Sequence, residues 1–294
     1  MDSKIKKTKS NYYKALTMSQ TKILESLATY KFLTSSQMVT LGVMTHEKNI
    51  NTQIRFLRGL PKPLMGSENY GSIPKIGRLE SIHFLTKKGK QLLIEELGYE
   101  PEDIRLPANS NSLFYQDYFH RKYTIDCHIR VNNWAKANGI EVIFFDRYFD
   151  KLGNNRVDKN MRAKTKINLK NKQYLIADGV FMILLPDGAQ ELYCLEMYDG
   201  KDTLRTLKQL KKHVEAIEIG SVSEQYGLPY AHRVLCVFEH EGLQKAVIKR
   251  ASQEREFTHV KEFFLTKTLQ QVITDEQPLS KGWVNLLGEE VGMY

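Results

Sequence analysis

Residues 191–213 read ELYCLEMYDGKDTLRTLKQLKKH, and this order sets the architecture of the second half of the chain. Glu191–Met197 is a short apolar run, which predicts a strand buried in a sheet. Lys201–Ile217 has apolar residues at helical spacing and predicts a helix. A second predicted strand, Tyr174–Leu185, precedes the first, and the Pro-Asp-Gly turn at 186–188 joins the two as a hairpin.

Outward from this stretch the pattern continues to alternate between strands and helices. A basic stretch of low apolar content, Lys151–Lys172, lies just before the hairpin. The other predicted elements are a long helix at Leu113–Ala137, strands at Ile140–Phe145, His232–Phe238 and Glu256–Leu265, and a helix at Glu241–Ser252. This order predicts an α/β (α+β) domain, a mixed sheet flanked by helices.

The first half of the chain has a different pattern, three short helices followed by a glycine-rich span, a strand and a last helix. The helices are predicted at Thr17–Tyr30, just after the capping signal Thr34–Gln37, and at Glu47–Leu60; the strand follows at Glu80–Leu85 and the last helix at Gln91–Leu97. This is the order of a winged helix, in which the third helix enters the major groove of DNA.

Basic and amide side chains on the predicted third helix are the first DNA-binding candidates. Amide and guanidinium groups suit base edges and phosphates. The candidates are Lys48, Asn51, Thr52, Arg55 and Arg58, with Lys87 and Lys88 before the last helix and Arg162, Lys164 and Lys166 in the basic stretch. Two alternatives remain, a solvated helix face and a face that docks a protein.

We expect four segments along the chain: a basic arm at 1–17, a winged helix at 18–98, a linker at 99–111 and the α/β domain at 112–294. The linker is polar and interrupted by prolines. The arm is either a solvated tail or an arm that contacts DNA.

Composition excludes several classes of protein. The 294 residues carry a net charge of +9 and are 41% hydrophobic, so the chain is neither wholly disordered nor acidic. No apolar run approaches the roughly 18–20 residues of a membrane span, and no secretory signal is present, so we expect a cytoplasmic protein. Three separate cysteines without a CxxC pair indicate neither a zinc cluster nor a disulfide scaffold; each is expected to be a small buried residue. A phosphate-binding GxxxxGK[ST] loop is absent.

Two carboxylates are the candidates for chemistry. Asp178 lies in the first predicted hairpin strand and Glu196 near the end of the second, so the hairpin brings them together at one end. Paired carboxylates can hold Mg²⁺ or Mn²⁺, which would activate a nucleophile and stabilise charge on a phosphate. The helix that follows carries Gln209 and His213 one turn apart on the same face.

This order, an Asp on one strand, a Glu on the next and a helix with a Gln, resembles the PD-(D/E)XK nuclease fold. The resemblance implies that Asp178 and Glu196 bind the metal and that Gln209 positions the DNA. Tyr198 stands where that family has its lysine, so Lys201, Lys208 or Lys211 would have to neutralise the transition-state charge.

The wider context resembles the replication-relaxation family and, within it, the MobC-type relaxases of mobilizable plasmids. Residues 194–213 (CLEMYDGKDTLRTLKQLKKH) and 232–239 (HRVLCVFE) carry most of the likeness. It implies a relaxase, a metal-dependent endonuclease that nicks one DNA strand at a transfer origin, with an accessory mobilization protein as partner. It also implies that His120, on the first helix of the nuclease-like domain, helps to orient the site.

Other readings stay open. Tyr198 at the lysine position favours a catalytically inactive accessory protein that positions DNA for a partner nickase, and a winged-helix transcription regulator is a third reading. A relaxase with a histidine cluster does not fit, because His120 and His128 form no His-x-His motif.

Overall fold

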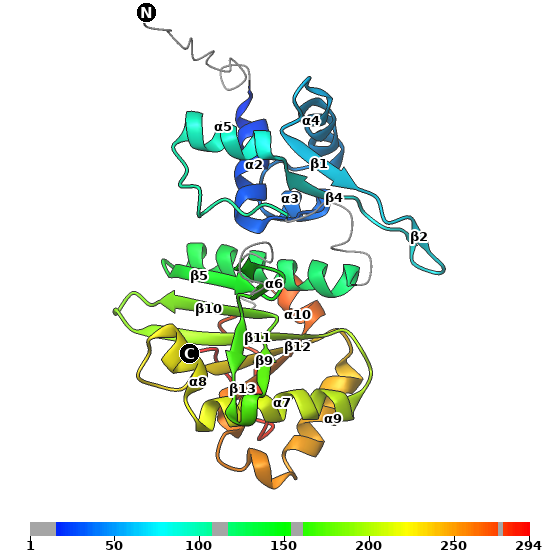
Figure 1. Ribbon diagram of the computed structural model, residues 1–294. Coiled ribbons are helices and arrows are strands. Elements are labelled where there is room, and N and C mark those ends of the chain that lie inside the picture. Colours follow the sequence, from blue (N-terminus) through cyan, green and yellow to red (C-terminus); the bar gives the residue numbers. More distant parts are fainter. Residues whose placement is uncertain (1–15, 108–116, 154–160, 276–278) are drawn as a thin grey trace, which may run out of the picture. The chain divides into compact units, whose positions relative to one another are not determined.

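The computed structural model describes residues 16–107, 117–153, 161–275 and 279–294. The chain divides into two compact units, Met1–Tyr118 and Phe119–Tyr294 (Figure 1). Most of the predicted basic arm, part of the predicted linker and the predicted start of the long helix, residues 113–116, lie outside the described residues.

The first unit begins with three helices, α2 (Met18–Tyr30), α3 (Ser35–Thr40) and α4 (Glu47–Gly59). Capping boxes start the first two, because the Thr17 and Thr34 hydroxyls accept backbone hydrogen bonds three residues along the chain. The apolar side of α4 is fully buried, as its spacing predicts. The first and third predicted helices are therefore confirmed. The second starts earlier than predicted, at Ser35, because Thr34 is its N-cap, and it ends at Thr40.

Two short antiparallel ladders and a last helix follow. β1 (Met65–Glu68) pairs with β4 (Ile82–Leu85), and β2 (Ser72–Ile73) pairs with β3 (Gly77–Arg78) in the hairpin that projects from the unit in Figure 1. β1 has no counterpart in the sequence prediction. α5 (Lys87–Leu97) starts four residues earlier than predicted, because the Thr86 hydroxyl caps it by accepting the Gly89 N–H.

The predicted linker at 99–111 is only partly a linker. The side chain of Ile104 in this segment is buried. The backbone N–H of Arg105 donates to the Ala28 carbonyl of α2 at 3.1 Å. The described part of this segment therefore packs onto the first unit.

The second unit is built on a seven-stranded mixed sheet with the order β15-β14-β13-β12-β11-β10-β5. Neighbouring strands are antiparallel except at the centre, where β11, β12 and β13 run parallel. The strands are β5 (Glu141–Arg147), β10 (Gly179–Leu184), β11 (Gln190–Tyr198), β12 (Arg233–Phe238), β13 (Phe264–Thr268), β14 (Trp283–Asn285) and β15 (Glu290–Val291).

Helices cover both faces of this sheet (Figure 1). α6 (Tyr118–Ala137) and α10 (Leu269–Thr274) share a buried cluster with the face that carries Tyr193, Leu195 and Met197. α7 (Thr203–Glu218), α8 (Ser221–Tyr226) and α9 (Glu241–Ala251) cover the opposite face. The predicted mixed α/β architecture is confirmed in this form.

Two predicted strands differ from the structure. Tyr174–Leu185 is broken: β9 (Tyr174–Ile176) pairs with β8 (Lys166–Asn168), while β10 begins at Gly179. Asp178 lies in the break because its carboxylate accepts the Met197 N–H of β11. The last predicted strand starts too early, since 3-10 turns at Arg255–Phe257 and Lys261–Phe263 precede β13.

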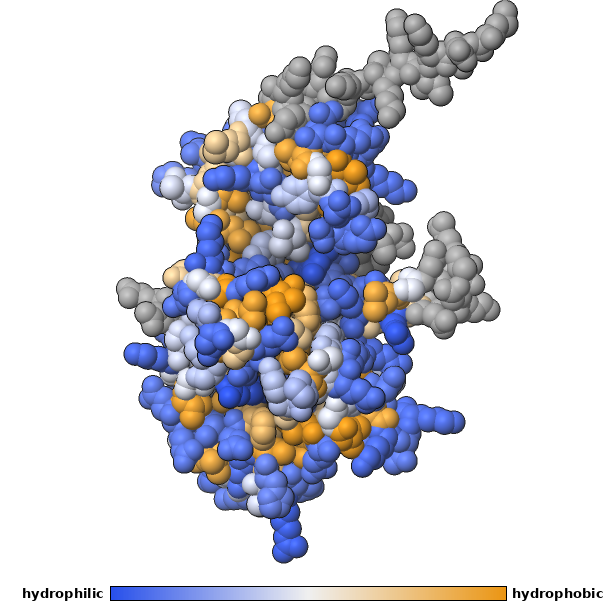
Figure 2. Space-filling view, turned by 90° about the vertical axis from the view of Figure 1, so that its left-hand side faces the viewer, coloured by the Kyte–Doolittle hydropathy of each residue, from blue (hydrophilic) through white to orange (hydrophobic). Residues whose placement is uncertain are grey.

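The basic stretch before the hairpin also contains short elements, the paired strands β6 (Lys151–Leu152) and β7 (Arg162–Ala163) and a 3-10 turn at Lys170–Lys172. Hydrophobic residues on the face shown in Figure 2 form patches separated by hydrophilic ones. Among the described residues, no helix combines the length and the apolar character that crossing a membrane requires.

Candidate functional site

Acidic side chains gather at the edge of the sheet where the central parallel strands end. β11 and β12 are in register to Tyr198 and Phe238, so Asp199 and Glu239 follow their ends side by side. Asp178 joins this edge because β10 runs antiparallel to β11 and Gly179 lies opposite Leu195. The carboxyl ends of parallel strands are a common place for ligands to bind.

His120, in the first turn of α6, lies between two of these acids. Its Nε2 is 2.9 Å from Asp178 Oδ1, and its Nδ1 is 3.5 Å from Asp199 Oδ1. Burial alone would lower the pKa of His120, but the charge and hydrogen bond of Asp178, with those of Asp199, raise it to about 11. The hydrogen bond from His120 holds the pKa of Asp199 below its usual value. The imidazole is therefore a cation held by two carboxylates.

Two tyrosines border the edge cluster, the group formed by His120, Asp178, Asp199 and Glu239. The Tyr123 hydroxyl, one turn further along α6, donates to Glu239 Oε1 at 3.3 Å. Burial and the Glu239 charge raise the pKa of Tyr123 to about 12, so it remains a hydrogen-bond donor at neutral pH. The Tyr148 ring meets the His120 ring edge-on. The backbone N–H of Tyr148 donates to the backbone carbonyl of Asp178.

Glu196 is different because it is fully buried on the α7 side of β11. Its neighbours on that side of the strand, Cys194 and Tyr198, belong to apolar clusters. Gln209 donates to Glu196 Oε2 at 2.5 Å, and His213 Nε2 lies 2.7 Å from Oε1. The predicted common face of Gln209 and His213 therefore exists, and it faces this carboxyl group.

Burial sets the protonation of this interior pair. It raises the pKa of Glu196 well above the usual value, an effect that the negative charge of Asp178 increases. It also lowers the pKa of His213 well below 6.5, with a contribution from His232. Burial therefore favours the neutral form of each group, and a hydrogen bond joins them at the short contact.

The edge cluster fits a hard divalent cation better than the interior pair does. Asp178 and Asp199 offer carboxylate oxygens, the ligands that Mg²⁺ prefers, and Asp199 is open to solvent. Glu196 was expected to share that cation, but both of its oxygens face donors on α7 in a fully buried position. Asp178 and Asp199 are the candidates for holding Mg²⁺ or Mn²⁺. Asp178 Oδ2 accepts the Met197 N–H, so a cation there would replace His120, which now contacts Asp178 Oδ1 and Asp199.

None of the three lysines predicted to complete the site has a contact with the edge cluster among the interactions of the described residues. Tyr198 is buried and stacked on Phe238, with ring centroids 5.0 Å apart. Lys201 and Lys208 are exposed, and Lys211 pairs with Glu254 and Glu256. Asp202 is the N-cap of α7, since its carboxylate accepts the Arg205 N–H.

The predicted DNA-binding side chains of α4 are mostly exposed. Lys48, Thr52, Arg55 and Arg58 are exposed, while Asn51 is half-buried and accepts the Ser35 hydroxyl at 2.7 Å. Asn51 therefore has a structural role in joining α3 to α4. At the start of α5, Lys87 is exposed and Lys88 is half-buried.

In the second unit, Arg162 is exposed, but its two basic neighbours have intramolecular contacts. Lys164 pairs with Asp146 at 2.7 Å, and the Lys166 ammonium lies 4.4 Å from the centre of the Tyr174 ring. The side chains of these two lysines therefore make contacts within the second unit.

Sequence reasoning missed several residues that the structure brings into view. Tyr123, Tyr148 and Glu239 join the edge cluster, yet none of them stands in a motif. In the first unit, Lys75 and Arg78 lie on the β2–β3 hairpin and are exposed. Basic residues within a Gly/Pro-rich span were the available signal for that pair.

The last missed group combines a cysteine and two histidines. Cys194, His213 and His232 place their Sγ and ring nitrogens within 4.8 Å of one another. Their separation in the sequence hides this proximity.

Comparisons with protein-family models, curated proteins and solved structures found no match to the chain.

Proposed function

We propose that this protein binds DNA through its first unit and cleaves one DNA strand at the edge cluster of its second unit, with Mg²⁺ or Mn²⁺. The observation that carries the proposal is the position of Asp178 at the start of β10, beside the carboxyl end of β11. The order α6, β5, β10, β11, α7, β12 keeps the arrangement on which the resemblance to PD-(D/E)XK nucleases rests. A strand-nicking relaxase that acts at a transfer origin is the specific form of this proposal.

The first unit supports DNA binding by its arrangement and its charges. Three helices, an antiparallel pair with a projecting hairpin and a last helix follow the order of a winged helix. Leu33 also forms a bridge with His83 of β4, which adds a third segment to this small sheet. In this arrangement α4 enters the major groove and the β2–β3 hairpin follows the backbone.

Within the edge cluster each residue has a distinct task. Asp178 and Asp199 would hold the divalent cation, which polarises the phosphate and lowers the pKa of a bound water. His120 orients Asp178, and Tyr148 orients the backbone beside it. Glu196 has no part in this cluster, because its two oxygens contact Gln209 and His213 of α7.

A second candidate is an accessory protein that positions DNA for a partner nickase and does not cleave it. Tyr198 supports this reading, because a buried aromatic ring stands where the nuclease family has its lysine. An accessory protein of this kind would keep the DNA-binding face of α4 and lose only the chemistry.

A nicking assay tests the proposal. The substrate is a supercoiled plasmid that carries the transfer origin of the element encoding this chain, incubated with Mg²⁺ or Mn²⁺ and, separately, with EDTA. We expect a metal-dependent open-circle product that Asp178→Asn reduces at least 100-fold. Asp187→Asn, in the exposed turn before β11, is the matched control and should nick normally. Undiminished nicking by Asp178→Asn would contradict the assignment of the site.

The DNA-binding step has its own test. Arg55→Ala and Arg58→Ala should each weaken binding to duplex DNA, by about 10-fold at 150 mM salt, and flatten its salt dependence. Binding without nicking by the wild type, also in the presence of the partner protein, would favour the accessory reading.

A further inference from the structure

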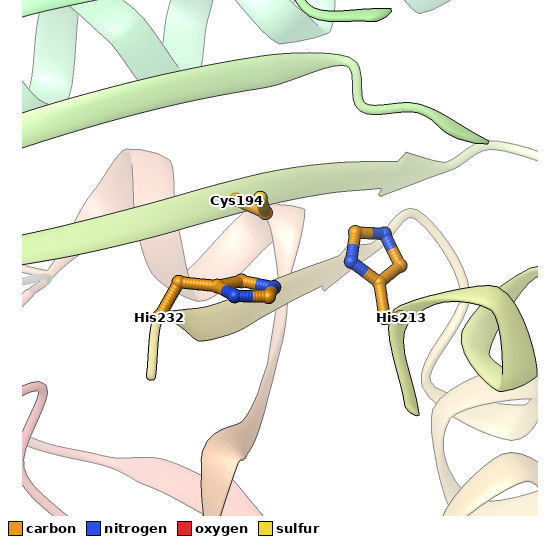
Figure 3. Close-up of side chains that lie close together, drawn as sticks. All are labelled: Cys194, His213 and His232. Carbon is orange, nitrogen blue, oxygen red and sulfur yellow. The ribbon is translucent and has the colours of Figure 1, made fainter. Parts of the chain in front are cut away.

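Three buried side chains that the proposed nuclease does not use converge on one point under the sheet. Cys194 comes from β11, His213 from α7, and His232 directly precedes β12 (Figure 3). Their Sγ and ring nitrogens all lie within 4.8 Å of one another, and the two imidazole rings are 6.1 Å apart between centroids. All three residues are fully buried.

The imidazoles carry polar atoms that nothing in the described part of the protein satisfies. Neither Nδ1 nor Nε2 of His232 has a hydrogen-bond partner, and Nδ1 of His213 has none either. A buried polar atom without a partner costs about 1–3 kcal/mol, so such groups are rare in native proteins and indicate a missing ion or water. These three nitrogens lie beside a cysteine sulfur, and such a set of nitrogen and sulfur atoms is one that a transition-metal ion can bind.

The state of the two histidines suits a metal. Burial lowers the pKa of His232 to about 4 and the pKa of His213 well below 6.5. Both rings are therefore neutral, the form in which a ring nitrogen offers a lone pair to a metal. Cys194 belongs to the same buried apolar cluster as Leu192 and Ala216.

We propose that Cys194, His213 and His232 bind one thiophilic transition-metal ion of the Zn²⁺ class at a buried site between β11, α7 and the start of β12. One thiolate with two imidazoles is a ligand set that such ions favour and that Mg²⁺ does not. This site is separate from the edge cluster, and its existence does not depend on DNA cleavage.

Glu196 gives the site its outer support. His213 contacts Glu196 through Nε2, which leaves Nδ1 to face the metal. A carboxylate that holds the far nitrogen of a metal-binding histidine fixes the ring and increases its basicity. Gln209 holds the other oxygen of Glu196 in turn.

Protons and charges balance when the ion binds. The Cys194 S–H bond breaks, its proton passes to solvent, and the sulfur electron pair forms the bond to the metal. His213 Nδ1 releases its proton to solvent, while the proton shared with Glu196 stays on Nε2. The thiolate and the Glu196 carboxylate then offset the two positive charges of the ion, so the buried site is neutral.

Cobalt is the probe that reads this site directly. The full-length protein is stripped with EDTA, titrated with Co²⁺ and then back-titrated with Zn²⁺. We expect one equivalent of Co²⁺ to bind, with a thiolate-to-cobalt charge-transfer band and intense visible bands from a distorted tetrahedral site, and Zn²⁺ to abolish both.

Variants locate the ligands. Cys194→Ser should remove the charge-transfer band, and His232→Asn should weaken Co²⁺ binding and change the visible bands. Glu196→Gln should keep the band and weaken Zn²⁺ about 10- to 100-fold in competition with a chromophoric chelator. The matched control is Cys236→Ser, an equally buried cysteine that lies opposite Glu196 on β12 and should leave the band unchanged.

Two results would overturn the proposal. One is a folded wild type, checked by circular dichroism, that gives no thiolate-to-cobalt band. The other is a band that survives Cys194→Ser or disappears in Cys236→Ser. Because the first result comes from the wild type, the proposal can be tested even if a variant fails to fold.

Discussion

The second unit contains two carboxyl–imidazole pairs of similar length that differ in ionisation. At the edge of the sheet His120 lies 2.9 Å from Asp178, and in the interior His213 lies 2.7 Å from Glu196. The edge pair is ionised, with the pKa of His120 raised to about 11. In the interior pair, burial raises the pKa of Glu196 and lowers that of His213, which favours the neutral form of each group.

The surroundings explain the difference. His120 is partly open to water and has a second acid, Asp199, on its other nitrogen. His213 has no exposed surface, and the group on its other side is the neutral His232. Removing two charges from water costs more than their attraction returns unless further groups solvate them. At the edge, a metal ion can take the place of the His120 cation between the two carboxylates. In the interior, a metal ion can bind His213 only if protons leave the buried site.

The largest expected effect comes from Glu196. Glu196→Ala would leave His213 Nε2 and Gln209 buried without a partner and open a cavity, so it should cost about 3–5 kcal/mol of stability. Glu196→Gln keeps the shape and can both donate to His213 and accept from Gln209, so it should cost about 1 kcal/mol or less. Urea denaturation of both variants measures this, and a cost of several kcal/mol for Glu196→Gln would show that the pair is ionised.

A buried histidine without any carboxylate partner sharpens the comparison. In the first unit His83 contacts the hydroxyls of Ser67 and Ser35, and burial, with the Arg58 charge, lowers its pKa to about 4. The unfolded chain, with a pKa near 6.5, binds the proton more readily, so stability is complete above pH 6.5 and falls as the pH drops toward 4. At pH 5 the first unit should have lost about 2 kcal/mol.

Native-state hydrogen exchange of the α2 amides at pH 7 and pH 5 measures the loss in the first unit alone. His83→Gln is the control, because it removes the titrating group and should flatten the pH dependence. An equal loss in His83→Gln would assign the effect to other groups.

Removing the charge of either acid beside His120 should lower the pKa of that histidine. Asp178→Asn removes the main source of the raised His120 pKa and should lower that pKa by about 1–3. Asp199→Asn should lower it less, because its contact is longer and more exposed. Titration of the His120 ring by NMR gives both values. An unchanged pKa in Asp178→Asn would show that Asp178 is not what raises the pKa of His120.

The smallest expected effect lies beside the edge pair. Tyr123→Phe removes the 3.3 Å hydrogen bond to Glu239 and should cost about 0.5 kcal/mol, since the contact is half-open to solvent. Urea denaturation checks this value. A cost above about 2 kcal/mol would indicate that the Tyr123–Glu239 hydrogen bond is as shielded from solvent as the Glu196–His213 pair.

Local signals in the sequence predicted most elements of both units. Hydroxyl caps such as Thr34 and the Asp202 N-cap fix where helices begin, and apolar spacing defines their buried sides. The break at Asp178 could not be predicted, because it depends on a hydrogen bond from Met197 on another strand. β1 was also missed, since it is a four-residue strand that only its pairing with β4 reveals.

The candidate site was predictable in part. Asp178, Glu196, Gln209 and His120 were all singled out, and the structure places each in contact with another carboxyl or donor group. Sequence spacing could not show that Glu196 faces α7 and not Asp199. The grouping of Cys194 with His232 arises from the tertiary fold, so no short motif records it.

The charge states of the two imidazoles test the central claim most directly. A long-range proton–nitrogen NMR spectrum of the metal-free wild type at pH 8, assigned with His120→Gln and His213→Gln, reads the protonation of every ring nitrogen. The account predicts that both nitrogens of His120 carry protons and that His213 is neutral, with one protonated nitrogen. A charged His213 or a neutral His120 would contradict it.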